Sequence, residues 1–98
     1  MARAKTQQVI GLWLDTTSDA PHDGGTWIVS RDEIYADGTG ENASNATVAT
    51  FATDQYDAAR AKAIELAIEL GLCVIETNED QTQECIYRPE GQPNPLSR

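Results

Sequence analysis

The chain has 98 residues, which is room for one domain with a single modest core but not for a core plus an elaborate catalytic apparatus. Its 16 Asp and Glu residues outnumber 7 Lys and Arg residues, and the formal net charge is −9. This charge opposes direct binding to nucleic-acid phosphates and to an anionic membrane surface. We therefore expect the partner to be a basic protein or nucleoprotein complex, with no direct nucleic-acid binding and no membrane.

The sequence favours a cytoplasmic location. It contains no apolar run of about 18 residues, and its charged first residues are not followed by the apolar segment of a signal peptide. Cys73 and Cys85 are then expected to be reduced, half-buried thiols, although a disulfide between them stays an alternative. Since His22 is the sole histidine, the two thiols lack partners for a four-ligand zinc site, and we expect no metal and no cofactor.

Alternating apolar residues predict the first two strands. Gln7–Leu14 alternates on both faces, and Gly11 within it indicates a bulge or the close approach of a neighbour. Residues 15–25 are rich in Asp, Thr, Pro and Gly and predict a long connection between antiparallel strands. Thr26–Arg31 is the second predicted strand.

Residues 32–46 are acidic, polar and glycine-containing, and we expect a mobile acidic loop there. The segment fails as a calcium loop. If Glu33 takes the first ligand position, Tyr35 replaces the third ligand and Ser44 stands where the bidentate Glu belongs. It also lacks the spacing and the lysine of a phosphate loop.

A third strand, Thr47–Thr53, leads into a helix predicted over Asp54–Gly71. Asp54 is the expected N-cap, and Gly71 is the expected left-handed residue that ends the helix. The helical period places five apolar residues on one stripe and predicts a well-buried second half; these are Ala59, Ala63, Leu66, Ala67 and Leu70. Arg60 borders the stripe, where either a snorkelling side chain or a binding role is open.

The remaining chain predicts a hairpin, Leu72–Thr77 and Thr82–Arg88, followed by a proline-rich tail, Pro89–Arg98, that we expect to be disordered. The expected organisation is therefore one α+β domain over residues 1–88 and a tail over 89–98. Its fold is an antiparallel sheet of four to five strands with one helix packed on one face, in the order of three strands, the helix and two strands.

The sequence gives no reason to expect an enzyme. Carboxylates can act as acid and base, but no serine in a nucleophile turn and no metal-ligand cluster accompanies them. The charge is concentrated before the helix, so we expect partner binding there, with Tyr35 as an anchor among acidic residues. The predicted partner-binding residues are Asp15, Asp19, Asp23, Asp32, Glu33, Tyr35, Asp37 and Glu41.

In its small size, its acidity and its lack of a catalytic motif, the chain resembles the anti-CRISPR proteins and other small inhibitors made by bacteriophages. The resemblance implies a protein that binds a nucleic-acid-handling complex and blocks its nucleic-acid path or a conformational step. Carboxylates on a small rigid domain suit that role, because they occupy a basic groove meant for phosphates. The alternatives are a self-associating structural or accessory module, such as a homodimer, and acidity that serves solubility.

Overall fold

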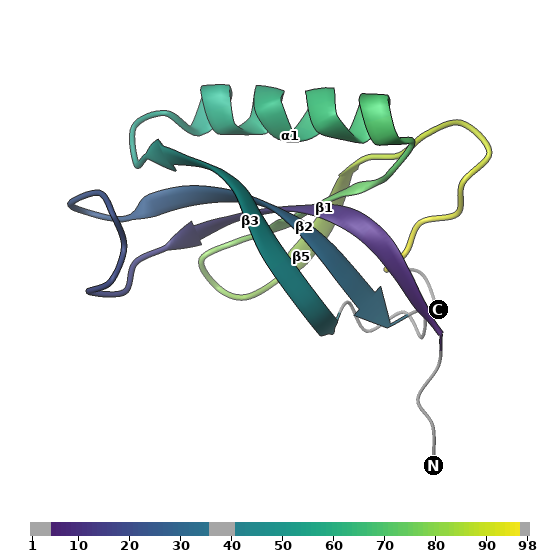
Figure 1. Cartoon of the computed structure of the whole chain (residues 1–98), viewed down its shortest axis with the longest axis horizontal. Helices are drawn as coiled ribbons and strands as arrows, with labels where there is room; N and C mark the ends of the chain where they lie inside the picture. Colours follow the sequence, from purple (N-terminus) through teal and green to yellow (C-terminus); the bar gives the residue numbers. More distant parts are fainter. Residues whose placement is uncertain (1–4, 36–40, 97–98) are drawn as a thin grey trace, which may run out of the picture.

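The computed structural model describes residues 5–35 and 41–96, which form one five-stranded sheet with one helix across a face (Figure 1). The elements in chain order are β1 (Thr6–Asp15), β2 (Thr26–Tyr35), β3 (Asn42–Ala52), α1 (Tyr56–Leu70), β4 (Val74–Thr77) and β5 (Gln83–Tyr87). In space the strands follow the order β3-β2-β1-β4-β5. The predicted α+β class and element order are confirmed.

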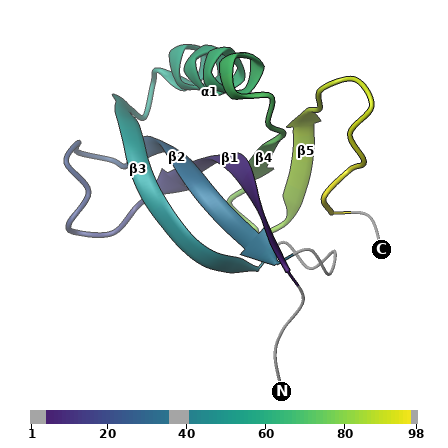
Figure 2. The ribbon, with the colours of Figure 1, turned by 45° about the vertical axis from the view of Figure 1, so that its right-hand side comes forward.

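The sheet is mixed rather than wholly antiparallel. β1 and β4 are parallel neighbours, whereas the other three pairs are antiparallel. The prediction of an all-antiparallel sheet is wrong for this pair, because α1 carries the chain from the end of β3 across the sheet and returns it to the other side of β1 (Figure 2). As a consequence, β1 and β4 end at the same end of the molecule.

β2 is longer than predicted, and the expected mobile loop over residues 32–46 is wrong for most of its length. Residues 32–35 continue β2, and β3 already begins at Asn42. Asp32 and Ile34 are 7% and 2% exposed, so the strand keeps its alternation through acidic residues. The acidic composition of the segment concealed this strand pattern.

One face of the sheet packs against α1 and forms the main core. Ile10, Leu12, Val29 and Val74 contribute the sheet side of this core, and all four are fully buried. The helix contributes the alanines of the predicted stripe, which bring its backbone close to the strands; they are Ala59, Ala63 and Ala67.

The helix ends differ in how well the sequence predicts them. Gly71 has φ of 70° and ends the helix in the left-handed conformation, as predicted. The N-cap is Gln55 rather than Asp54, because a tight turn from Ala52 to Gln55 precedes the helix and the Gln55 side chain accepts from the Ala52 amide at 3.1 Å. The expected burial of the second half is confirmed for Ala63 and Ala67 but is wrong for Leu70, which is 39% exposed.

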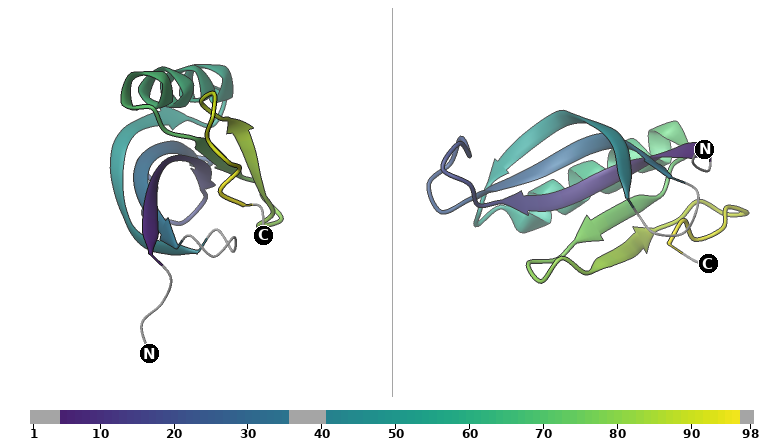
Figure 3. Two further views of the ribbon diagram at one scale, coloured as in Figure 1. Left: turned by 90° about the vertical axis from the view of Figure 1, so that its right-hand side faces the viewer. Right: turned by 90° about the horizontal axis from the view of Figure 1, so that it is seen from below.

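The other face of the sheet, which we call the open face, carries a smaller cluster of Val9, Ile34, Cys73 and Ile75. Both cysteines are free thiols. Leu96 packs on this cluster, so the segment after β5 folds back along the sheet (Figure 3).

The sequence predicts a disordered tail from Pro89, and the structure places residues 89–96 in an irregular but packed path. Pro95 is buried. The Gln92 side-chain amide donates to the Gly71 carbonyl at 2.9 Å, which satisfies a backbone group at the helix end. The segment therefore contacts the open face around Leu96, and beside it lies a pocket that no residue of 89–96 lines.

Candidate functional site

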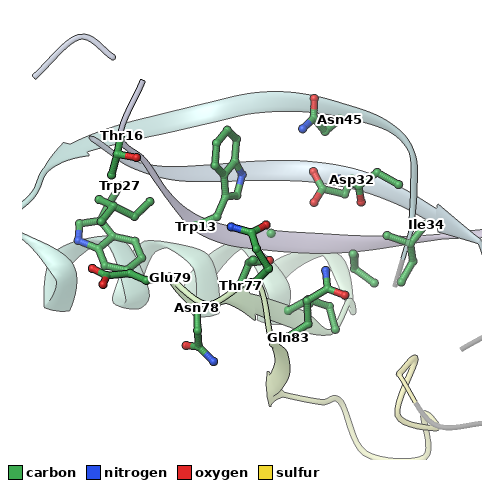
Figure 4. Close-up of a pocket in the computed structure, with 16 residues that line it drawn as sticks. Trp13, Thr16, Trp27, Asp32, Ile34, Asn45, Thr77, Asn78, Glu79 and Gln83 are labelled. Carbon is green, nitrogen blue, oxygen red and sulfur yellow. The ribbon is translucent and has the colours of Figure 1, made fainter. Parts of the chain in front are cut away.

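The pocket on the open face has a volume of about 600 Å³, within the range of ligand sites. It extends from Thr16 and Glu79 at one end of the sheet to Asp32 and Ile34 further along the strands. Figure 4 shows the Asp32 carboxyl group between Trp13 and Ile34, on the side of the sheet away from the helix.

Strand register builds the floor of this pocket. In the β1–β2 ladder Gly11 lies opposite Ser30, and Asp32 is the next residue of β2 on the same face. A Cβ atom at position 11 would lie 2.3 Å from Asp32 Oδ2 and 2.7 Å from Ser30 Oγ. Glycine is therefore required here by the close approach of the Asp32 side chain, which was one of the two predicted reasons for it.

A short hydrogen-bond chain holds one part of the Asp32 carboxylate. The Trp13 indole N–H donates to Ser30 Oγ at 3.2 Å, and the Ser30 hydroxyl donates to the carboxylate of Asp32. Oδ1 of Asp32 is buried, and no group in the described part of the chain donates a hydrogen bond to it. Burial raises the pKa of Asp32, and the Ser30 hydrogen bond offsets part of that rise.

The lining of the pocket is acidic and polar around a few apolar side chains. Asp32 and Glu79 are its two carboxylates, and no Lys or Arg from residues 5–35 or 41–96 lines it. Hydroxyl and carboxamide groups add further polar atoms, among them those of Thr77, Asn45 and Gln83 (Figure 4). The pocket therefore attracts positive charge and offers hydrogen-bond acceptors to it.

A second acidic feature, which we call the acidic end, lies where β1 and β4 end, β2 begins and α1 starts. It gathers half of the 16 carboxylates of the chain. They are Asp15, Asp19, Asp23, Asp54, Asp57, Glu76, Glu79 and Asp80. Arg60 of α1 lies close enough to Tyr56, near the start of the helix, to act on its phenol.

The structure separates the predicted partner-binding residues into groups. Asp15, Asp19 and Asp23 lie at the acidic end, in or beside the connection between β1 and β2. Glu33, Tyr35 and Glu41 lie at or near the other end of β2, about 30 Å away for a ten-residue strand. The backbone N–H of Tyr35 donates to the carbonyl of Glu41 at 2.9 Å, which ties this second group together.

Two further predicted residues belong to neither group. Asp32 is not on an acidic surface, because it is buried in the floor of the pocket. Asp37 lies outside the described residues.

Sequence reasoning missed Trp13 and Ser30 as parts of a site. The signal was the alternation of residues 28, 30, 32 and 34 along β2, which places Ser30 and Asp32 on one face with two isoleucines. Contributions from β3, β4 and β5 to the same pocket leave no local signal, because they depend on strand order.

Other kinds of site find no support in the described residues. They contain no group of three or more His, Cys, Asp or Glu side chains arranged to hold a metal ion. None of their helices has the length and apolarity needed to span a membrane. Comparison with protein-family models found no match, and comparison with curated proteins and with solved structures found no significant match.

Proposed function

We propose that the protein is a non-enzymatic inhibitor that binds a basic protein or nucleoprotein complex through its acidic end and blocks the path of nucleic acid there. The gathering of half of the carboxylates at one end of the sheet carries this proposal. Carboxylates gathered at one end of a small domain suit a basic groove built for phosphates. The proposed site of action is the cytoplasm.

The resemblance in kind to phage-encoded anti-CRISPR proteins supports the same reading, because such inhibitors act on complexes that handle nucleic acid. Electrostatic steering speeds the association of an acidic protein with a basic groove, and this advantage falls steeply with salt. The proposal therefore requires that binding weaken with salt and compete with nucleic acid.

The experiment compares two variants with the same change in charge. Asp19→Asn/Asp23→Asn removes two exposed carboxylates at the acidic end, and Glu69→Gln/Glu90→Gln removes two exposed carboxylates elsewhere, one near the far end of α1 and one after β5. A partner is first captured from the natural host and identified by mass spectrometry. Binding to the purified partner is then measured over a salt series, with a fluorescent oligonucleotide as competitor.

We expect the acidic-end variant to bind about three- to tenfold more weakly at low salt, as two exposed charge pairs of modest strength predict. The control variant should bind like the parent, and the oligonucleotide should be displaced by the parent. Equal binding by both variants, or simultaneous binding of protein and oligonucleotide, would contradict the proposal.

Self-association is a second candidate function, and β3 supports it. This edge strand has 11 residues, none of them charged or proline, which is the kind of edge that pairs with another strand. Register shifts near Val48 and Asn42 interrupt its regularity. Sedimentation velocity at several concentrations tests this candidate, and a strict monomer across the micromolar range would refute it.

A further inference from the structure

We infer that the pocket on the open face binds the side chain of an arginine, with the Asp32 carboxylate accepting hydrogen bonds from the guanidinium group. The inference rests on the proposed function for the source of this arginine, a residue of the basic partner. The chemistry of the pocket is the reason for expecting an arginine side chain there.

The first argument is the hydrogen-bonding state of Asp32. Asp32 is only 7% exposed, and a buried carboxylate is costly unless donors satisfy it; Ser30 supplies one donor, while Oδ1 receives none from the described residues. The chain accommodates this side chain by having glycine at position 11, directly beneath it. An apolar residue at position 32 would serve a purely structural strand better, so the carboxylate is suited to a donor from outside.

The second argument is the surroundings of the carboxylate. Trp13 is held by its hydrogen bond to Ser30, so its aromatic ring has a fixed place in the pocket. Cations bind favourably at the faces of indole rings, and a planar guanidinium pairs with a carboxylate through two parallel hydrogen bonds. Asn45 and Thr77 provide further oxygens for the remaining donors.

The third argument is access. The pocket reaches from the acidic end, at Thr16 and Glu79, to Asp32, and its volume of about 600 Å³ exceeds that of one side chain. An arginine of a partner bound at the acidic end would therefore enter along an acidic path. The terminal torsion of an aspartate is soft, so the Asp32 carboxylate can rotate to meet a donor that enters the pocket.

The experiment uses three capped amino acids as probes: N-acetyl-arginine amide, its lysine counterpart and its citrulline counterpart. Citrulline has nearly the same shape as arginine but carries no charge. Binding is followed by NMR through the indole N–H signal of Trp13, which is assigned by its loss in Trp13→Phe. We expect saturable binding of the arginine probe, weaker binding of the lysine probe and none of the citrulline probe.

Variants then locate the binding. Asp32→Asn should weaken arginine binding at least about tenfold, as loss of a charge-assisted hydrogen bond predicts, while thermal unfolding shows the fold to be intact. Trp13→Leu should weaken it as well, and Asp19→Asn/Asp23→Asn should leave it nearly unchanged. The inference is overturned if the arginine probe does not saturate, if citrulline or lysine binds as tightly, or if Asp32→Asn binds like the parent.

These outcomes separate the two proposals. Loss of probe binding in Asp19→Asn/Asp23→Asn with full binding in Asp32→Asn would place the arginine at the acidic end and overturn the pocket inference alone. If probe binding depends on Asp32 but partner binding is the same in the parent and in Asp19→Asn/Asp23→Asn, the proposed function alone is overturned.

Discussion

Replacing Asp32 by Asn should make the protein more stable at neutral pH. Asp32 is 7% exposed, and its Oδ1 atom has no hydrogen-bond donor from the described residues. Asn has nearly the same shape and still accepts from the Ser30 hydroxyl, so the change removes the buried charge without creating a cavity. Most substitutions of buried residues destabilise the fold, so a stabilising effect of Asp32→Asn is a specific test of this reasoning.

The magnitude follows from the cost of the unsatisfied group. A buried polar atom without a partner costs about 1–3 kcal/mol, and a charged one costs more. Asn retains part of that cost, because its amide N–H groups occupy the place of the unpaired oxygen. We therefore expect a gain of about 1–2 kcal/mol, which raises Tm by at least about 4 °C in a domain of this size.

The pH dependence gives this prediction a second, independent outcome. Burial raises the pKa of Asp32 above its ordinary value of 3.8. Between the two values the folded protein binds more protons than the unfolded chain, so parent stability falls as pH rises through the folded pKa. Asn does not titrate, and the advantage of the variant should be complete at neutral pH and vanish near pH 4.

Urea unfolding followed by tryptophan fluorescence, at about pH 7 and about pH 4, measures both outcomes. Urea is the denaturant of choice because guanidinium is itself the group proposed to bind Asp32. Asp19→Asn is the matched control, since it removes an exposed carboxylate and reports general relief of the net charge. If Asp32→Asn were no more stable than Asp19→Asn at neutral pH, the carboxylate would be fully satisfied and the reasoning refuted.

Three further predictions concern other residues. Gly11→Ala should lower the free energy of unfolding in urea by about 1–3 kcal/mol, because the added Cβ atom would meet Asp32 Oδ2 at 2.3 Å. This cost should shrink in an Asp32→Ala background, and equal costs in both backgrounds would refute the contact. Tyr56→Phe should lower the free energy of unfolding by about 1–2 kcal/mol, because it removes the 2.5 Å hydrogen bond to Glu76. Burial and then Glu76 raise the pKa of Tyr56 to about 12, so the variant should also lack the last step of an ultraviolet phenol titration. Burial and then the neighbouring thiol raise the pKa of Cys73 to about 11, so thiol-labelling kinetics at about pH 8 should show one slow thiol that becomes fast in urea.

The local parts of the fold were predictable from local patterns. Gly71 ends the helix because only a residue tolerant of positive φ fits there, and this requirement is visible in the sequence. The stripe of small residues on α1 likewise predicted which side meets the sheet. The second half of α1 extends beyond that contact, since Ile68 is 62% exposed, and periodicity does not report where the partner sheet stops.

The pairing of strands and the pocket were not predictable in the same way. β4 is parallel to β1 because the helix crosses the sheet, and no residue of β4 encodes the direction of its neighbour. The pocket joins side chains from five strands, so its polarity emerges only from strand order. Asp32 is the instructive case: its acidity suggested a surface loop, whereas its spacing from Ile34 suggested a strand, and spacing proved the better guide.

Part of the acidic end has a structural explanation, and this decides which carboxylates test the proposed function. Asp15 Oδ1 accepts from the Thr17 amide at 2.9 Å and Asp80 Oδ1 from the Thr82 amide at 3.1 Å, so both shape turns. Asp57 lies in the first helical turn, where the helix dipole favours negative charge.

Asp19 and Asp23 are exposed and lie in a connection where turn chemistry requires neither charge. If the acidity served solubility alone, the variant that loses two charges at Glu69 and Glu90 and the variant that loses them at Asp19 and Asp23 would bind the partner equally well. A binding defect confined to the first pair therefore distinguishes a recognition surface from a merely soluble one, because the net charge of the two variants is the same.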